Sequence, residues 1–264
     1  MNSKRKHIKT KAIKAACFIA LIFGMTSCNE ESTNTNGHEI EVDLDDTTYY
    51  DDESILDEES LSSEYGDFEV PDGYSILAEE NSDLDGDGID EKVVIFDTDR
   101  AGEMGTEREV HVYALYEDHW SLWESFIGPV LASEHGGMMG DPFEKLEVHD
   151  QRIYINHFGG SSSKWHFTHE FEFKNDNWTV AAATLVYFQN CVYSETYTYD
   201  FNERTCFYSK QLETCNEDGM VLDRTMEDSE LIDMDSSTPA PEMKDFSPGG
   251  TLIDLKGEKE IYYL

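Results

Sequence analysis

The stretch from Trp165 to Phe173 alternates strictly between two kinds of side chain, and this alternation constrains the fold more than any other feature. The odd positions carry Trp, Phe, His, Phe and Phe, whereas the even positions carry His, Thr, Glu and Glu. Successive side chains of a β-strand point to opposite faces of a sheet, so a period of two predicts a strand with one buried face and one wet face. The segment therefore belongs in a sheet and not in a helical bundle.

Neighbouring segments extend this pattern into hairpins. Lys174–Asn177 has the composition of a turn, and the run Trp178–Phe188 after it is apolar on both faces, which predicts a central strand. Three further strand pairs follow the same logic: Val110–Tyr116 with Ser121–Phe126, Lys145–Val148 with Arg152–His157, and Tyr193–Phe201 with Cys206–Tyr208. Successive hairpins with short turns predict a mostly β fold, in which an antiparallel meander forms a sheet or a sandwich.

Composition divides the chain after its first 28 residues into three parts. Residues 29–69 contain no Lys or Arg and few aliphatic side chains, so we expect a disordered acidic tether that buries too little apolar surface to fold. Residues 70–215 hold the predicted strands and have the usual size of one domain. Residues 216–264 are again acidic, and we expect an extension with edge strands at Thr251–Leu255 and Glu260–Leu264.

Residues 1–28 have the three parts of a secretory leader. A basic start precedes the apolar run Ala15–Phe23, and the small residues Thr26 and Ser27 precede Cys28. A cysteine directly after the small residues resembles a lipobox, the signal of bacterial lipoproteins. The resemblance implies cleavage before Cys28, acylation of that cysteine and a lipid anchor in a membrane. The apolar run is shorter than the ~20 residues that span a bilayer, which argues against a transmembrane helix.

The leader and the acidic segment after Cys28 look like those of Bacteroidota lipoproteins. This resemblance implies a cell-envelope location, at the outer membrane or the cell surface. Removal of the leader would also change the charge of the mature protein. Six of the 19 Lys and Arg residues lie in the leader, which has no acid, so 13 bases would face 57 acids at a formal charge of −44. Such a charge excludes nucleic acid as a partner and favours a basic protein or a cationic ligand.

One short segment, residues 83–91, carries a definite metal-binding pattern. Carboxylates at positions 1, 3 and 5 converge in a tight loop, a glycine at position 6 allows the turn, a carbonyl follows at position 7 and an acid at position 9. The predicted ligands are Asp83, Asp85, Asp87, the carbonyl of Ile89, and Glu91. Hard oxygen ligands at this spacing suit Ca²⁺, although Val94 stands where an EF-hand has its bidentate acid.

A predicted strand, Lys92–Phe96, follows this loop, and no helix does. The arrangement resembles the calcium loops of FG-GAP and VCBS-type modules, and the resemblance covers about 15 residues, Ser82 to Phe96. The loop occurs once, which supports a metal site and not a propeller. The alternative is an acidic turn that needs no ion. The expected role of Ca²⁺ is to fix a loop between two strands and to stabilise the fold when bound.

Two glycine-rich segments, residues 134–143 and 157–165, stand out further along the chain. Together with the calcium loop they look like stretches of uncharacterised secreted or lipoprotein domains, a resemblance that implies no activity. One interpretation makes the two segments the rim of a ligand site, with four contact residues: His135, Asp141, His157 and Trp165. The other interpretation is that the glycines supply positive φ at turns between strands.

Catalytic signals are weak in this chain. His166 and His169 lie on opposite faces of one predicted strand, so they cannot share a zinc ion as a helical pair would. We therefore expect a non-enzymatic binding or scaffolding protein whose ligand and oligomeric state the sequence does not give. The alternative is a cell-envelope hydrolase of glycan or peptide, with its site at residues 134–143 and 157–165.

Three cysteines remain after the leader: Cys191, Cys206 and Cys215. An odd count allows one internal disulfide at most. We expect Cys206–Cys215, which would close a loop beside the last hairpin. Cys191–Cys206 and three free thiols are the alternatives.

Overall fold

The computed structural model describes residues 68–235, 239–255 and 261–263, all within the compact unit Asp57–Leu264. The lipobox at Cys28 and nearly all of the expected tether lie outside the described residues. The described part is mostly β, as the alternating pattern predicts. It contains one short 3₁₀ helix, and no helix in it is long and apolar enough to cross a membrane.

The first sheet is an antiparallel meander of four strands in sequence order. Its strands are β1 (Ser75–Ser82), β2 (Glu91–Gly102), β3 (Gly105–Tyr116) and β4 (His119–Ile127). The loop between β1 and β2 is the predicted calcium loop, because Ser82 and Glu91 pair across the start of the hairpin.

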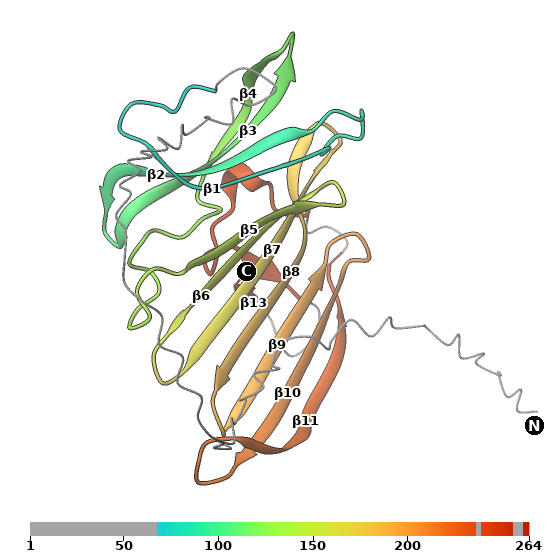
Figure 1. Ribbon diagram of the computed structural model, residues 1–264. Coiled ribbons are helices and arrows are strands. Elements are labelled where there is room, and N and C mark those ends of the chain that lie inside the picture. Colours follow the sequence, from blue (N-terminus) through green and yellow to red (C-terminus); the bar gives the residue numbers. More distant parts are fainter. Residues whose placement is uncertain (1–67, 236–238, 256–260, 264) are drawn as a thin grey trace, which may run out of the picture. The chain divides into compact units, whose positions relative to one another are not determined.

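The second sheet is an antiparallel meander of seven strands, which Figure 1 shows side by side in sequence order. Its strands are β5 (Phe143–His149), β6 (Arg152–Gly160), β7 (Lys164–Lys174), β8 (Asn177–Gln189), β9 (Tyr193–Asp200), β10 (Thr205–Cys215) and β11 (Val221–Asp233). The run that is apolar on both faces forms β8, which lies between β7 and β9 as expected for a central strand.

Three of the hairpin turns consist of two residues, both with positive φ. They are Glu117-Asp118, Asp150-Gln151 and Asn175-Asp176, with φ between 47° and 65°. Two left-handed residues in succession match the twist of the flanking strands, which is why Asn and Asp are favoured in such turns. All three lie where the sequence predicts turns.

The main core lies between the two sheets. Alternate residues of β2 and β3, such as Val93, Ile95 and Val110, pack in one cluster with Ile155 and Phe171 of the seven-stranded sheet. The other face of the four-stranded sheet carries a smaller cluster, whose buried members are Val94, Phe96 and Tyr113. The first six residues of β2, Glu91 to Phe96, are therefore buried on both faces.

The segment after residue 215 takes part in this packing. The acidic strand β11 forms one edge of the seven-stranded sheet, and the 3₁₀ helix η1 (Met243–Asp245) contacts β4 and β8. Met243 and Phe246 are buried in the main core. The short strands β12 (Leu252–Asp254) and β13 (Ile261–Tyr263) pair with each other in a two-stranded sheet.

The disulfide prediction is wrong. The bond joins Cys191, in the turn between β8 and β9, to Cys215 at the end of β10. Cys206 is buried in the main core, where its side chain lies on the face of β10 that packs inward. The predicted bond was expected to close a loop beside the last hairpin, but Cys206 and Cys215 belong to one extended strand, β10, which holds them far apart. The turn that precedes β9 brings Cys191 next to the end of β10 instead.

Candidate metal site and a buried arginine centre

The loop between β1 and β2 gathers carboxylates at one point. One donor oxygen from each of Asp83, Asp85 and Glu91 lies within 4.8 Å of the others. The two aspartates come from the loop, and Glu91 is the first residue of β2. These three residues could hold a metal ion between them, and all three are among the predicted ligands.

Glu91 is the unusual member of this group because it is only 3% exposed. Its Oε2 accepts a hydrogen bond from the Leu84 N–H at 2.7 Å, and this contact favours the charged carboxylate. Burial raises the pKa of Glu91, and the nearby charges of Asp85, Asp87 and Asp83 raise it further against the effect of that hydrogen bond. A buried carboxylate among other carboxylates needs either a proton or a cation.

Backbone geometry holds the loop in its tight shape. Gly88 has a φ of +90°, so the predicted turn glycine adopts a conformation that disfavours other residues. The Asp83 carboxylate accepts hydrogen bonds from the N–H groups of Gly86 and Gly88, at 2.7 and 3.1 Å. Asp87 accepts one from the Ile89 N–H at 2.8 Å. Asp87 and Ile89 thus belong to the same turn, although neither is in the close group of three.

The loop is attached to both sheets. The Leu84 side chain is buried in the main core between the sheets. A Cβ atom added at Gly86 would lie 2.5 Å from the amide nitrogen of Gln151, in the turn between β5 and β6, so the two segments are in close contact. An ion in the loop would therefore stabilise the junction between the sheets as well as the β1–β2 hairpin.

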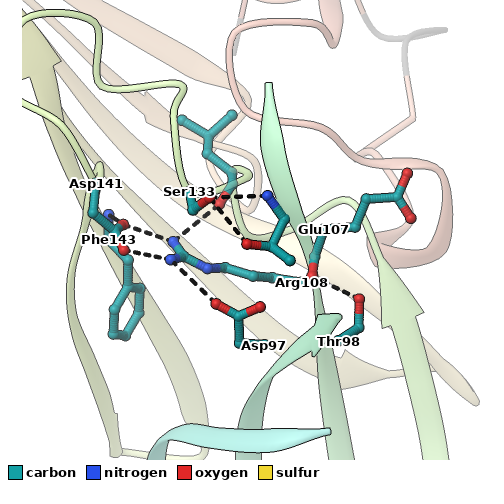
Figure 2. A network of polar contacts seen from close by, with 9 residues as sticks. Asp97, Thr98, Glu107, Arg108, Ser133, Asp141 and Phe143 are labelled. Atoms are coloured by element: carbon teal, nitrogen blue, oxygen red, sulfur yellow. Dashed lines mark hydrogen bonds and ion pairs between the residues drawn. The ribbon is translucent and has the colours of Figure 1, made fainter. Parts of the chain in front are cut away.

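A second polar centre lies on the inward face of the four-stranded sheet, at Arg108 of β3 (Figure 2). Its side chain is 1% exposed and forms a bidentate ion pair with Asp141, with one contact at 2.7 Å. The guanidinium also donates to the Leu131 carbonyl at 3.3 Å and lies 3.9 Å from Asp97. Arg108 is not among the candidate residues predicted from the sequence. The sequence does contain a signal for it, because this basic residue falls in the same alternation as the inward-facing residues Val110 and Val112.

The ion pair with Arg108 favours the charged form of Asp141. Partial burial opposes ionisation, but hydrogen bonds from Arg108 and from the Phe143 N–H outweigh it and hold the pKa of Asp141 below its usual value. His157 lies in the same neighbourhood and is fully buried. Its Nε2 accepts a hydrogen bond from the Leu131 N–H at 3.2 Å, so the proton of the neutral ring is on Nδ1. Burial, with the charge of Arg108, lowers the pKa of His157 to about 3.

The four residues of the predicted ligand rim thus separate into different roles. Asp141 and His157 meet around Arg108, and the exposed His135 lines a pocket of about 310 Å³ beside that arginine. Trp165 covers Gly159 instead, because a Cβ atom there would lie 2.3 Å from its ring. The glycines therefore let segments approach closely as well as turn.

A hydrogen-bonded chain of side chains on the outward face of the four-stranded sheet also escaped the sequence analysis. Arg100 donates to the Tyr74 hydroxyl at 2.7 Å and to Glu109 at 2.5 Å. Glu109 is 2.7 Å from the His111 Nε2, and the His111 Nδ1 is 3.1 Å from the Tyr113 hydroxyl. The signal in the sequence was the polar series at alternate positions of β3. These hydrogen bonds hold Tyr74, which precedes β1, on the four-stranded sheet.

Comparison of the chain with protein families, with curated proteins and with solved structures finds no match. None of these comparisons points to a catalytic activity.

Proposed function

We propose that this chain is a lipid-anchored cell-envelope protein whose β-domain is stabilised by calcium and serves as a non-enzymatic binding or scaffolding module. The observation that carries the proposal is the buried Glu91, which shares one point with Asp83 and Asp85 and has no positive side chain in that group. Carboxylate oxygens in a flexible loop suit Ca²⁺, and extracellular modules bind it at about 10⁻⁴–10⁻³ M. Asp87 and the Ile89 carbonyl are the further ligands that the loop pattern predicts.

A pocket beside the loop supports a binding role. It has a volume of about 430 Å³, within the range usual for ligand sites, and it includes loop and sheet residues. The lining residues are Asn81, Gly88, Ile89, Asp90, Leu115 and Trp120. Because three of them belong to the calcium loop, an ion that fixes the loop would also fix one wall of the pocket.

The hydrolase alternative gains no support from the arginine centre. The carboxylate of Asp141 is paired with Arg108, and the His157 imidazole is buried with its Nε2 hydrogen-bonded to backbone. A general acid or base must reach a substrate atom within hydrogen-bond distance, and the His157 imidazole is too buried to do so. Asp141 is partly exposed, but Arg108 lowers its pKa, which makes it a poor proton donor or acceptor near neutral pH.

Calorimetric titration of the full chain with Ca²⁺ tests the metal proposal. We expect one site with a dissociation constant of about 10⁻⁴–10⁻³ M, weakened tenfold or more by Glu91→Gln. Asp90→Asn is the matched control, because Asp90 is in the same loop but outside the close group. Equal effects of the two substitutions would mean that only general acidity attracts the ion.

The lipid anchor needs its own test. Cells that express the chain are given a palmitate analogue that can be labelled, and the protein is isolated with detergent. We expect the label on the wild-type chain and none on Cys28→Ala, which would also leave the membrane fraction. Label retained by the variant would refute acylation at Cys28.

A further inference from the structure

The edge of the seven-stranded sheet formed by β11 is long and exposed. Among the described strands, β11 is hydrogen-bonded to β10 alone. Ile232 is the one buried residue of its 13, so both faces and the outer edge face solvent. A strand in this position presents a row of backbone N–H and C=O groups that can pair with another strand.

The two faces of β11 differ in chemistry. Leu231 lies opposite Phe207 of β10, and both are exposed on the face away from the core, with Met226 further along the same face. The face toward the core side instead carries Asp228 and Glu230, which lie opposite Lys210 and Tyr208. An added strand would thus meet apolar side chains on one face and carboxylates on the other.

Apolar side chains gather unusually on this part of the surface. The most exposed are Leu222 at 68% and Leu231 at 63%. Others on β10, β11 and the turn before β11 are Phe207, Leu212, Met220, Val221 and Met226, each 40% exposed or more. Single exposed apolar residues are ordinary, but Phe207, Met226 and Leu231 share one face of neighbouring strands, and such a group indicates an interaction surface.

Charge selects the partner. The segment from Val221 to Asp233 has five acids and one base, Arg224, which is paired with Glu213 at 3.0 Å. A second copy of β11 would bring the same excess of negative charge to the edge. Residues 29–67 of the chain contain no Lys or Arg and would be repelled in the same way. Charge therefore disfavours pairing of the edge with a second β11 or with residues 29–67, and it favours a basic segment.

A disulfide lies at the end of β10, the strand to which β11 is hydrogen-bonded. The Cys191–Cys215 bond links the end of β10 to the turn between β8 and β9, two strands in from β11. The bond restrains the end of β10, to which β11 is hydrogen-bonded, so less conformational freedom is lost when another strand is added to β11. Such preorganisation increases affinity without any new contact.

We propose that β11 binds an extended basic segment of a partner protein by β-strand addition. In the bound state the partner strand hydrogen-bonds to the outer edge of β11. Its Lys and Arg residues face Asp228 and Glu230, and its apolar residues face Met226 and Leu231. Backbone pairing supplies affinity, and the alternating side chains supply specificity. This inference does not depend on calcium.

Fluorescence anisotropy with a synthetic peptide tests the proposal on the full chain at physiological salt. The probe alternates Lys with Val or Thr over about ten residues, and a scrambled peptide of the same composition places all Lys residues together. We expect the alternating probe to bind at least tenfold more tightly than the scrambled one. Hydrogen exchange should show new amide protection at residues 221–233. Equal binding of the two peptides, or protection elsewhere, would overturn the proposal.

Two charge variants with the same net change separate edge binding from general attraction. Asp228→Lys with Glu230→Lys should weaken the alternating probe tenfold or more, whereas Glu69→Lys with Glu80→Lys, exposed at and near β1, should change it less than threefold. Circular dichroism of both variants checks that they fold. Equal loss in both variants would show non-specific electrostatics. Concentration-dependent dimers of the peptide-free chain with protected residues 221–233 would assign the edge to a second copy and overturn the proposal.

Discussion

Two carboxylates in this molecule meet opposite electrostatic surroundings. Asp141 is 47% exposed and has the guanidinium of Arg108 as its partner, which keeps its pKa low. Glu91 is almost fully buried, with carboxylates as its charged neighbours, so its pKa is raised. Arg108 provides a positive charge beside Asp141, whereas the described residues place only negative charges beside Glu91. Asp83, Asp85 and Glu91 could therefore hold a cation from solution, whereas Asp141 already has its counter-charge.

Two buried histidines, His157 and His169, should make the fold sensitive to acid, and this is the largest effect that we expect. His157 and His169 are fully buried, burial lowers both pKa values, and neither ring nitrogen of His169 has a hydrogen-bond partner among the described residues. The pKa of a histidine in the unfolded chain is about 6.5, so above that pH these histidines do not weaken the fold. As pH falls below it, the free energy of unfolding decreases by about 1.4 kcal/mol per pH unit for each histidine.

Urea denaturation at pH 7, 6 and 5 measures this slope. His169→Leu should remove about half of the loss, while the exposed His119→Leu should leave the slope unchanged. Comparing variants isolates the histidines, because protonation of the many surface acids also relieves repulsion. A slope that His169→Leu does not alter would contradict the assignment.

Removing the counter-charge from Asp141 should cost less. Arg108→Met leaves the Leu131 carbonyl and the Asp141 carboxylate without their guanidinium, and a broken buried pair costs about 3 kcal/mol. The control is Arg152→Met, because Arg152 is about one-third exposed and pairs with Glu170; there we expect at most about 1 kcal/mol. Equal losses of unfolding free energy would mean that the burial of Arg108 contributes nothing special.

Without bound calcium, the contribution of Glu91 to stability should change with pH in the direction opposite to that of the two histidines. A raised folded pKa means that Glu91 favours the fold below about pH 4.5 and that this contribution is lost as pH rises through the folded value. Calcium needs the charged carboxylate, so its stabilising effect should grow from pH 5 to pH 8. We expect a difference of about 1 kcal/mol, absent in Glu91→Gln. An effect that is constant with pH would exclude Glu91 as a ligand.

Much of the fold could be predicted because it is encoded in local patterns. Period-two alternation and turn residues located the hairpins from Val110 to Tyr208, and the close group of Asp83, Asp85 and Glu91 lies within nine residues of sequence. These features need only the conformation of one short segment.

The features that sequence reasoning missed depend on neighbours far apart in the chain. Arg108 and Asp141 are 33 residues apart, and their pairing requires two sheets to pack. The disulfide partner of Cys215 could be seen only once β9 was known to turn back beside β10. The acidic charge of residues 216–264 concealed a few apolar residues, such as Met243 and Phe246, that pack into the core.

The melting temperature of the full chain across a calcium titration tests the central claim most directly, with magnesium and a chelator as controls. Binding at about 100 times the dissociation constant stabilises a fold by about 2.7 kcal/mol, which corresponds to a rise of roughly 5–10 °C for a domain of this size. We predict that rise for calcium, little change for magnesium and reversal by the chelator. A melting temperature that calcium leaves unchanged would contradict the account and make residues 83–91 an acidic turn.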